Sequence, residues 1–346
     1  MTVVSQYAYL HARVSVLTQY LFQEKLLSTL IDGGNGGNIL LQHAGVIRHS
    51  LEETFPRMEG KEYAAILEQH LIGLFLADVK NLVGHLDGVA RDLLIYWARR
   101  YELANLKMII RGRIAGQNSA WIHKELIDVG TFATFRVGDL LQTEDVSEML
   151  RRLEATAYKN IARQARTLLA GRNEPFTLDA VIDKHYHAEL HQCIRALPIF
   201  DQRYLRPLIG ILIDRFNLVW LLRYRFSHDL PPAHAYYLLI PGGIHLTSDR
   251  LLSLIRLGTF GEVIRQLPTA LAAVVGTVAT TSEVEDRLTH EIERQAQIVL
   301  KRTLFSVARA FAYLLIREYQ LYQIHAILKG KALGLDESVI RRAARC

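Results

Sequence analysis

The stretch Tyr101-Glu-Leu-Ala-Asn-Leu-Lys-Met-Ile-Ile-Arg-Gly-Arg113 recurs twice in this chain, and each copy closes a long helical block. The second copy is Phe216-Asn-Leu-Val-Trp-Leu-Leu-Arg-Tyr-Arg225, and the third is Tyr319-Gln-Leu-Tyr-Gln-Ile-His-Ala-Ile-Leu-Lys-Gly-Lys331. When the leading aromatic residues are aligned, apolar residues coincide as well: Leu103, Leu218 and Leu321, then Leu106, Leu221 and Ile324. The recurrence predicts that the fold is built from repeated units.

The interval between the copies indicates the size of the repeat. Phe216 and Tyr319 are 103 residues apart, and Thr156 and Thr259, which close Leu-Glu-Ala-Thr and Arg-Leu-Gly-Thr, show the same interval. Such a period indicates repeated domains of about 100 residues rather than a solenoid of short units. We therefore expect three homologous domains, 1–120, 121–235 and 236–346.

The composition is that of a folded protein. Of 346 residues, 50% are hydrophobic and 22% are charged, which excludes a disordered chain. The two cysteines, Cys193 and Cys346, provide no disulfide framework and suit a reducing compartment. The first residues lack the features of a secretory signal, and no apolar run is long enough for a membrane span. We expect a cytoplasmic protein.

The net charge of +6 favours acidic partners or proximity to anionic lipid headgroups. Lys and Arg are spread along the chain rather than gathered in one run, and no nucleic-acid-binding motif accompanies them. We expect no nucleic acid among the partners.

Apolar periodicity predicts helices throughout. Leu10, Val14, Leu17 and Leu21 form a stripe that predicts a first helix over 7–31. Asp32-Gly-Gly-Asn-Gly-Gly-Asn38 ends it as a plain loop, because no strand precedes it and no Gly-Lys-Ser/Thr follows. Pro231-Pro232 is a linker into the third block, in which 283–308 is expected to be a long helix. With only short β-branched runs, the fold class is all-α.

No catalytic constellation is present in the sequence. It has no Walker motif, no Gly-x-Ser-x-Gly elbow, no Cys-x-x-Cys pair and no Asp-Asp-x-x-Asp cluster. His187 and His191 are four residues apart on one helical face and could ligate a metal. No Glu directly follows the first of them, as it would in a zincin, and we favour packed histidines. We expect no active site, no metal and no cofactor.

Three longer motifs carry a family resemblance over nearly the whole chain. They are the aromatic-Glu-x-x-Asn-Leu-x-x-Ile-x-Arg-Gly-Arg pattern ending at Arg113, Leu-Ile-Pro-Gly-Gly at 239–243, and the segment from Arg317 to Leu335 with its Ile-Leu-Lys-Gly-Lys run. In this order they resemble the C subunit, also called the d subunit, of V-type and archaeal-type rotary ATPases. Gln320, Gln323 and His325 depart from the family pattern, which has an acidic residue, Asn and a basic residue there.

The resemblance implies a non-catalytic rotor subunit of the central stalk. Its three domains would surround a pseudo-threefold axis and form a funnel. The implied partners are the rotor shaft, made of a coiled-coil protein with its small companion, and the proteolipid ring of the membrane sector. The protein would lie peripherally on the cytoplasmic face of the membrane, would couple ATP turnover or synthesis to ion transport, and would bind no small-molecule substrate. The alternative is a generic helical adaptor unrelated to rotary ATPases.

Each organising helix ends in a pair of cations: Arg111 with Arg113, Arg223 with Arg225, and Lys329 with Lys331. In one interpretation these residues only complement the negative ends of helix dipoles. In the other, the pseudo-threefold arrangement gathers the three pairs into a basic rim for acidic partners or lipid headgroups. The sequence leaves both interpretations open.

Overall fold

The computed structural model describes residues 3–22, 24–32, 60–170 and 175–345. Within these ranges the secondary structure is helical and no strand occurs, so the predicted all-α class is confirmed. The chain divides into two compact units. The first comprises Met1–Leu94, Ile127–Val129 and Ala296–Cys346, and the second comprises Ile95–Leu126 and Gly130–Gln295.

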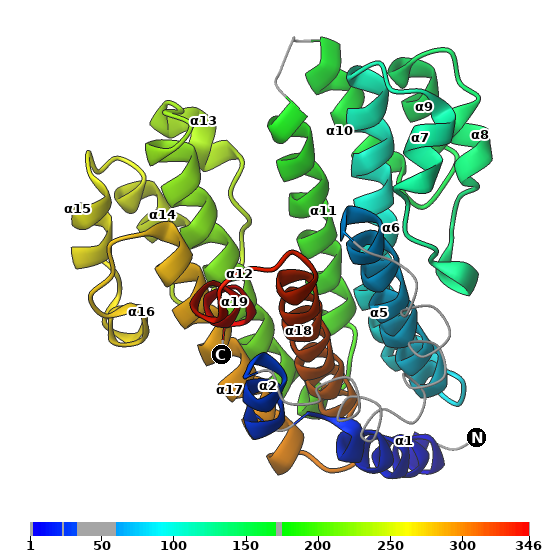
Figure 1. Cartoon of the computed structure of the whole chain (residues 1–346), viewed down its shortest axis with the longest axis vertical. Coiled ribbons are helices and arrows are strands. Elements are labelled where there is room, and N and C mark those ends of the chain that lie inside the picture. The colour runs from blue at the N-terminus through cyan, green and yellow to red at the C-terminus, as the bar shows by residue number, and fades with distance from the viewer. Residues whose placement is uncertain (1–2, 23, 33–59, 171–174, 346) are drawn as a thin grey trace. The chain divides into compact units, whose positions relative to one another are not determined.

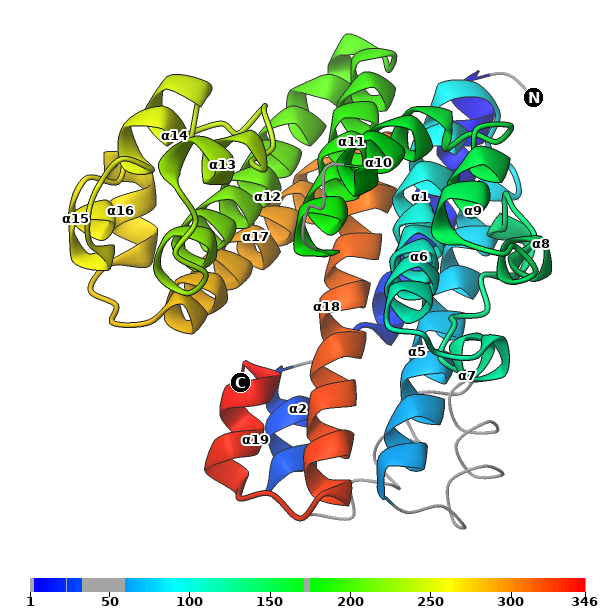
Figure 2. The same cartoon turned by 90° about the horizontal axis from the view of Figure 1, so that it is seen from above.

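The first unit is organised around α18 (Val307–Ala332). This helix packs against α5 (Gly60–Val83), α19 (Glu337–Ala344), α1 (Val3–Leu17) and α2 (Glu24–Ile31). Figures 1 and 2 show these four helices beside α18 from two directions. The third copy of the organising stretch is therefore the centre of this unit.

The sequence of α18 explains why it lies in the interior. Its first part, residues 307–317, is apolar on all sides, and every residue there except Arg309 is buried. A helix that is hydrophobic all round has no solvent face and must be surrounded by other helices. The polar exceptions are paired: the Arg317 Nε lies 3.2 Å from an Asp78 carboxylate oxygen, to which the Tyr313 hydroxyl donates at 2.8 Å.

The predicted helix over 7–31 is wrong in its middle. α1 ends at Leu17, η1 (Thr18–Tyr20) follows, and the chain is extended at Leu21 before α2 begins at Glu24. Side chains of α18 hold this break: the Arg317 Nη1 donates to the Tyr20 carbonyl at 3.3 Å, and Gln320 bonds the Phe22 backbone. Apolar periodicity cannot register a partner almost 300 residues away. The predicted loop at 32–38 lies outside the described residues from 33 onward.

The second unit has α11 (Pro175–Arg195) and α12 (Ile199–Phe226) at its centre, and α10 (Lys159–Ala170) packs on α11. Most of α6 (Gly88–Ile114) also belongs to it. The remaining elements are short: α7 (Ser119–Lys124), η3 (Gly130–Phe132), α8 (Val137–Leu141), α9 (Val146–Leu153), α13 (Pro232–Tyr237), α14 (Ser248–Leu254), α15 (Phe260–Arg265) and α16 (Thr269–Val275).

The short helices from α13 onward pack into one apolar core with α12 and α17 (Thr281–Arg302). Buried leucines of α12, among them Leu218 and Leu222, meet residues of α14 and α17 such as Leu251 and Leu288. The predicted helix over 283–308 is too long, because α17 ends at Arg302. Ser306 caps the next helix, its Oγ accepting from the Ala308 amide at 3.0 Å.

The aligned apolar positions of the three copies are core positions. The copies lie in α6, α12 and α18. All six aligned side chains are at most 5% exposed: Leu103, Leu106, Leu218, Leu221, Leu321 and Ile324. The repeated register therefore marks the same buried face of each helix.

The first and third copies also end in the same turn. Gly116 and Gly334 have φ values of 69° and 64°, and their amides donate to the carbonyls of residues 113 and 331. The next amides donate to Gly112 and Gly330, which completes a Schellman motif in both copies. The middle copy has no glycine there, and its helix ends at Phe226 with a positive φ only at Asp229.

Close packing of the following helix explains the second glycine of each motif. A Cβ on Gly112 would lie 2.7 Å from the Ile122 Cγ1, and a Cβ on Gly330 would lie 2.7 Å from the Ile340 Cγ1. Ile122 belongs to α7 and Ile340 to α19, so each of these two organising helices is followed by a short helix that packs against its glycine. The Arg-Gly-Arg and Lys-Gly-Lys sequences are thus packing motifs as well as basic ones.

Candidate functional site

The predicted basic pair of α6 contacts acidic and carbonyl groups of its own unit. The Arg111 guanidinium pairs with the Asp179 carboxylate of α11. Arg113 reaches past the end of its helix and donates to the carbonyls of Thr143 and Glu144. Arg111 is half-exposed, whereas Arg113 serves as a clamp on the segment between α8 and α9.

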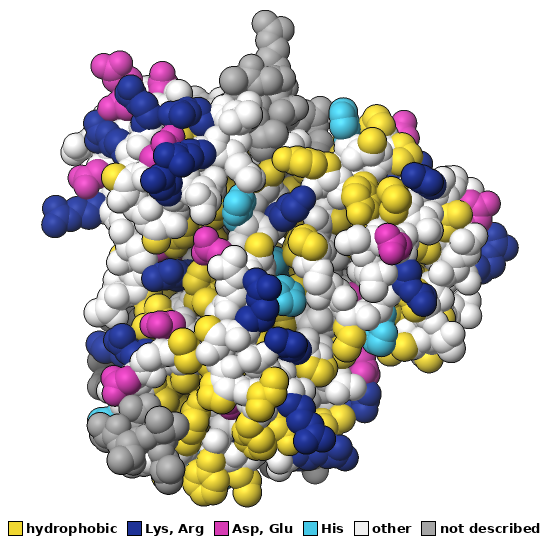
Figure 3. Space-filling view, turned by 180° about the vertical axis from the view of Figure 1, so that it is seen from behind, with side chains coloured by type: hydrophobic (Ala, Val, Ile, Leu, Met, Phe, Trp, Pro, Cys, Tyr) yellow, Lys and Arg dark blue, Asp and Glu magenta, His cyan; other side chains and the backbone are white. Residues whose placement is uncertain are grey.

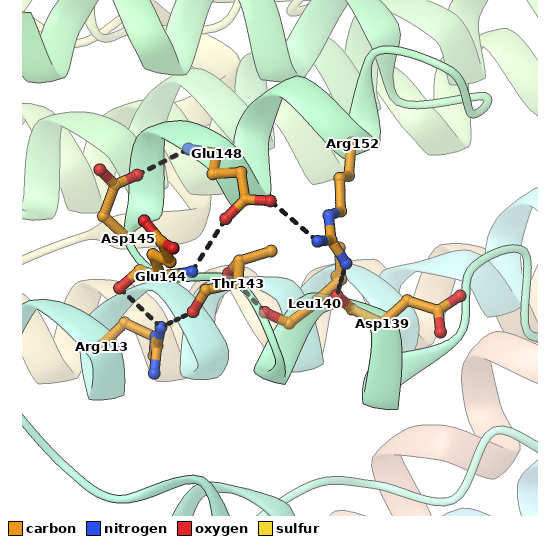
Figure 4. Close-up of polar contacts among 8 residues, drawn as sticks. All are labelled: Arg113, Asp139, Leu140, Thr143, Glu144, Asp145, Glu148 and Arg152. Atoms are coloured by element: carbon orange, nitrogen blue, oxygen red, sulfur yellow. Dashed lines mark hydrogen bonds and ion pairs between the residues drawn. The ribbon is translucent and has the colours of Figure 1, made fainter.

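The segment that Arg113 holds is itself a helix start (Figure 4). Asp145 caps α9 by accepting from the Glu148 amide at 2.7 Å, and Glu148 accepts from the Glu144 amide at 2.9 Å. The Glu144 hydrogen bond is the main cause that lowers the pKa of Glu148, with Arg152 adding to it. Backbone and side-chain contacts therefore fix the place at which Arg113 binds.

In the pair of α12, likewise, the first arginine forms an ion pair and the second bonds backbone carbonyls. Arg223 is exposed, and its Nη2 lies 2.8 Å from a carboxylate oxygen of Glu285, which Arg215 also contacts at 2.6 Å. Arg225 donates through Nε to the Ile255 carbonyl at 2.9 Å and through Nη1 to the Leu230 carbonyl at 2.7 Å. The second cation of each pair in the second unit is thus bonded to backbone.

Lys329 and Lys331, in the first unit, are both exposed. The four arginines belong to the second unit. Arg113 and Arg225 bond carbonyls of segments that lie after their helices. The interpretation that the pairs complement helix dipoles stays a prediction. A basic rim made from all three pairs stays a prediction, for which Arg111, Arg223 and the two lysines are the exposed members.

Positive charge is not confined to these residues. On the face shown in Figure 3, Lys and Arg side chains are spread over the surface with Asp and Glu side chains among them. The spread agrees with the sequence, in which no long basic run occurs.

A second repeated feature was not predicted from the sequence. The residue that follows the leading aromatic of each copy is a buried polar side chain that hydrogen-bonds another segment. In the first copy this residue is Glu102, which is 1% exposed. Its carboxylate accepts from the amides of Thr134 and Phe135, from the Thr134 hydroxyl at 2.8 Å and from the Tyr158 hydroxyl. The carboxylate faces four donors, which is the environment in which a buried carboxylate is stable. Burial, with the nearby Glu102 charge, raises the pKa of Tyr158.

In the second copy the corresponding residue is Asn217, which is 0% exposed. Its Nδ2 donates to the Ile240 carbonyl at 2.7 Å, and its Oδ1 accepts from the Ile240 amide at 2.8 Å. The side-chain amide satisfies both backbone groups of one buried residue, as a neighbouring strand would. Ile240 lies in the Leu-Ile-Pro-Gly-Gly motif, so the second copy holds that motif in place.

In the third copy the residue is Gln320, which is 5% exposed. Its Oε1 accepts from the Phe22 amide and its Nε2 donates to the Phe22 carbonyl, both at 2.8 Å. This contact explains why the third copy has Gln where the first copy has Glu. Glu102 faces only donors, whereas Gln320 faces one donor and one acceptor, and only an amide matches both.

Helix α12, which carries Asn217, holds the Leu-Ile-Pro-Gly-Gly loop at a second point. Asp214, which is 0% exposed, accepts from the amides of His245 and Leu246, each at 2.9 Å. A Cβ on Gly243 would overlap an Asp214 carboxylate oxygen and lie 2.9 Å from the Leu246 carbonyl oxygen, so this position has room only for glycine. Burial raises the pKa of Asp214, and the backbone donors oppose that effect.

The two histidines considered as metal ligands, His187 and His191, both lie in α11 but pack against different groups. His187 is 5% exposed, and its ring centroid lies 4.9 Å from that of Phe216, the leading aromatic of the second copy. Burial, with the charges of His191, Lys107 and Arg100, lowers the pKa of His187 to about 3. A Cβ on Gly242, which has φ of 104°, would lie 2.6 Å from the His191 Nε2. His187 is a neutral core residue, and His191 lies against the loop backbone.

Within the described residues, the structure offers neither a metal cluster nor a membrane-spanning helix. No group of three or more His, Cys, Asp and Glu side chains there is arranged to hold a metal ion. No helix in the described ranges is both long and apolar enough to cross a membrane. The repeated polar clamps, Glu102, Asn217 and Gln320, and the repeated basic helix ends are therefore the features that characterise this chain.

Several known proteins match this chain over nearly its whole length. The family model described as ATP synthase (C/AC39) subunit matches residues 12–343. The C subunit of the A-type ATP synthase of Methanosarcina mazei is 22% identical over 97% of this chain and 92% of its own length. The protein of the same name from Methanocaldococcus jannaschii is 22% identical over 98% of this chain and 86% of its own length. That from Halobacterium salinarum is 23% identical over 97% of this chain and 97% of its own length. The chain therefore belongs to the C/AC39 family of ATP synthase subunits, found in archaeal-type rotary ATPases.

Proposed function

We propose that this chain is the central-stalk socket of its rotary ATPase, a non-catalytic part of the rotor that couples the shaft to the proteolipid ring. The shaft partners would be the coiled-coil protein and its small companion. The chain would lie peripherally on the cytoplasmic side of the membrane and transmit torque. A socket that transmits torque must keep its shape and its contacts with shaft and ring while it is loaded.

The observation that carries the proposal is the polar clamp that recurs in all three organising helices. Glu102, Asn217 and Gln320 are each buried at the same register, and each fixes the backbone of an irregular segment. Buried hydrogen bonds of this kind are costly to break, so each clamp resists bending between a helix and its neighbouring segment. Three equivalent stiff walls suit a socket around a pseudo-threefold axis.

The proposed arrangement has three domains, 1–120, 121–235 and 236–346, around that axis. The equivalent buried positions of the three copies, and the shared Schellman turns of the first and third, support it. An experimentally determined structure tests it: the three segments should superpose as helical domains, with α6, α12 and α18 on one another. Unrelated packing partners for these helices would contradict it.

Co-purification tests the partner assignment. A tagged chain expressed in its own host should bring down the ATPase head, the shaft proteins and the proteolipid ring. Recovery of unrelated proteins would favour a generic helical adaptor. Neighbouring genes for Walker-motif ATPase proteins and a proteolipid would support the rotary assignment, and titration of the isolated chain with ATP should give no binding heat.

The basic rim can be separated from the helix-end interpretation by two variants. The first replaces the exposed cations (R111Q/R223Q/K329Q/K331Q) and should weaken assembly with a partner at low salt, with little loss of stability, because exposed ion pairs contribute about 0–1 kcal/mol each. The second replaces the backbone-bonded cations (R113Q/R225Q) and should mainly lower the unfolding temperature. Unchanged affinity of the first variant for shaft and ring at all salt concentrations would refute the rim.

A further inference from the structure

The turn between α11 and α12 projects two bulky apolar side chains into solvent. Ile199 is 78% exposed and Phe200 is 49% exposed. They occupy the first two positions of a 28-residue helix whose other face is buried from Asp201 and Gln202 onward. Among the large hydrophobic side chains that the structure describes as exposed, Ile199 has the largest exposed fraction. This apolar pair is unusual at the tip of a rigid helical turn.

The turn is held closed, so the pair is displayed in a fixed place. The Gln202 Nε2 donates to the Leu197 carbonyl at 2.7 Å and to the Arg195 carbonyl at 3.0 Å. Leu197, at 3% exposed, anchors the turn in the core. The Phe200 ring packs edge-on against Tyr204, with centroids 5.5 Å apart. These contacts fix the turn, so Ile199 and Phe200 are held at the solvent-exposed start of α12.

Three exposed arginines flank the pair in the sequence: Arg195, Arg203 and Arg206. Arg203 lies four residues after Ile199 and Arg206 seven, which places them on the same face of the helix. The charges of Arg195 and Arg206 both help to lower the pKa of the His191 imidazole, after burial. The only acidic residue from 195 to 206 is Asp201, which is 1% exposed.

We infer that this tip, defined by Arg195, Ile199, Phe200, Arg203 and Arg206, inserts into the headgroup layer of an anionic lipid bilayer. Guanidinium groups pair with lipid phosphates, and apolar side chains gain by entering the acyl boundary. A fluid interface accepts two isolated apolar side chains without a complementary pocket, which a folded protein surface would have to supply. The inference rests on the proposed function only in placing the chain beside a membrane.

Vesicle flotation tests the inference on the full-length chain. Binding should be strong to vesicles of phosphatidylcholine mixed with phosphatidylglycerol, weak to phosphatidylcholine alone, and reduced by salt. R195Q/R203Q/R206Q should lower the partition coefficient about fivefold for each arginine, or roughly a hundredfold in total. I199S/F200S should lower it by roughly tenfold or more, with salt dependence retained. Ile199→Ser alone provides a milder variant if the double substitution impairs folding.

Matched controls separate the tip from general charge and hydrophobicity. R250Q/R256Q/R265Q removes three exposed arginines elsewhere in the same unit, and Ile114→Ser removes an exposed apolar side chain at the end of α6. Both should bind anionic vesicles like the unaltered chain. Equal losses in controls and tip variants would overturn the inference.

Failure of the lipid contact can be distinguished from failure of the proposed rotor function. If the chain co-purifies with the ATPase but does not bind vesicles, the rotor assignment is retained and the lipid contact is refuted. Tip variants that lose the proteolipid ring, while the unaltered chain shows no vesicle binding, would assign the tip to a protein contact instead. Vesicle binding without co-purification would support the tip and refute the rotor assignment.

Discussion

Replacement of Asn217 by Ala should destabilise the second unit strongly. The substitution removes two hydrogen bonds, of 2.7 and 2.8 Å, and leaves the amide and carbonyl of Ile240 without their partner. Both residues are 0% exposed, so water cannot replace the lost contacts without opening the core. Each buried group left unsatisfied costs about 1–3 kcal/mol, and the expected loss for the two groups is therefore about 2–6 kcal/mol.

Two measurements check this expectation. Urea unfolding, followed by fluorescence and by circular dichroism, gives the change in stability and shows whether the two units unfold together. Hydrogen exchange of the Ile240 amide reports the clamp directly and should accelerate by a larger factor than exchange in α18. Asn160→Ala, at an exposed position of α10, is the matched control and should stay within about 0.5 kcal/mol.

The isosteric change Asn217→Asp refines the test. A carboxylate keeps the acceptor for the Ile240 amide but presents an oxygen to the Ile240 carbonyl, so the variant should be less stable at pH 8 than at pH 5. An Asn217→Ala variant that loses less than about 0.5 kcal/mol, with unchanged Ile240 exchange, would show that the clamp contributes little, and the stiff-wall argument would fail with it.

Three further predictions concern other residues. The pKa of His187 falls from 6.5 to about 3 on folding, so its stabilising effect is complete above pH 6.5 and is lost as the pH falls toward 3. His187→Gln should therefore lessen the loss of stability on acidification by about 1.4 kcal/mol per pH unit below 6.5. An identical pH dependence in His187→Gln and the unaltered chain would refute this. Gly112→Ala and Gly330→Ala should each lower the free energy of unfolding by about 1–3 kcal/mol through overpacking. Gly73→Ala, whose Cβ would have nothing within 4 Å, should instead raise it by about 0.4–1 kcal/mol, and thermal unfolding measures all three variants. Equal effects at the three glycines would contradict the packing account. Gln320→Glu should lower the free energy of unfolding by about 2–4 kcal/mol, and by more at pH 8 than at pH 5, because a carboxylate would face the Phe22 carbonyl. Urea unfolding at both pH values measures this loss, and a gain in stability would contradict the donor–acceptor match.

The sequence by itself determined the fold class, the family resemblance and the places of the organising helices. Helical periodicity is a local property, because a buried face recurs every three or four residues whatever lies opposite it. The aligned Leu103, Leu218 and Leu321 mark one repeated apolar face, and the structure shows that all three are buried. The glycines of the first and third copies indicated helix ends by the same local logic.

The tertiary structure decided which polar residues matter. Glu102, Asn217 and Gln320 stand in one register beside the buried leucines, and that coincidence was a readable signal, but only the fold shows what each faces. Four donors select a carboxylate at the first position, and a donor with an acceptor selects an amide at the others. These partners are 23 to 298 residues away along the chain.

The break in the predicted first helix has the same origin. Leu10, Val14, Leu17 and Leu21 keep helical spacing across it, so no local pattern marks the interruption near Phe22. Gln320 takes the backbone groups of Phe22 that a continuous helix would have used. Local sequence sets which segments can be helical, and long-range hydrogen bonds to buried side chains decide where those helices stop.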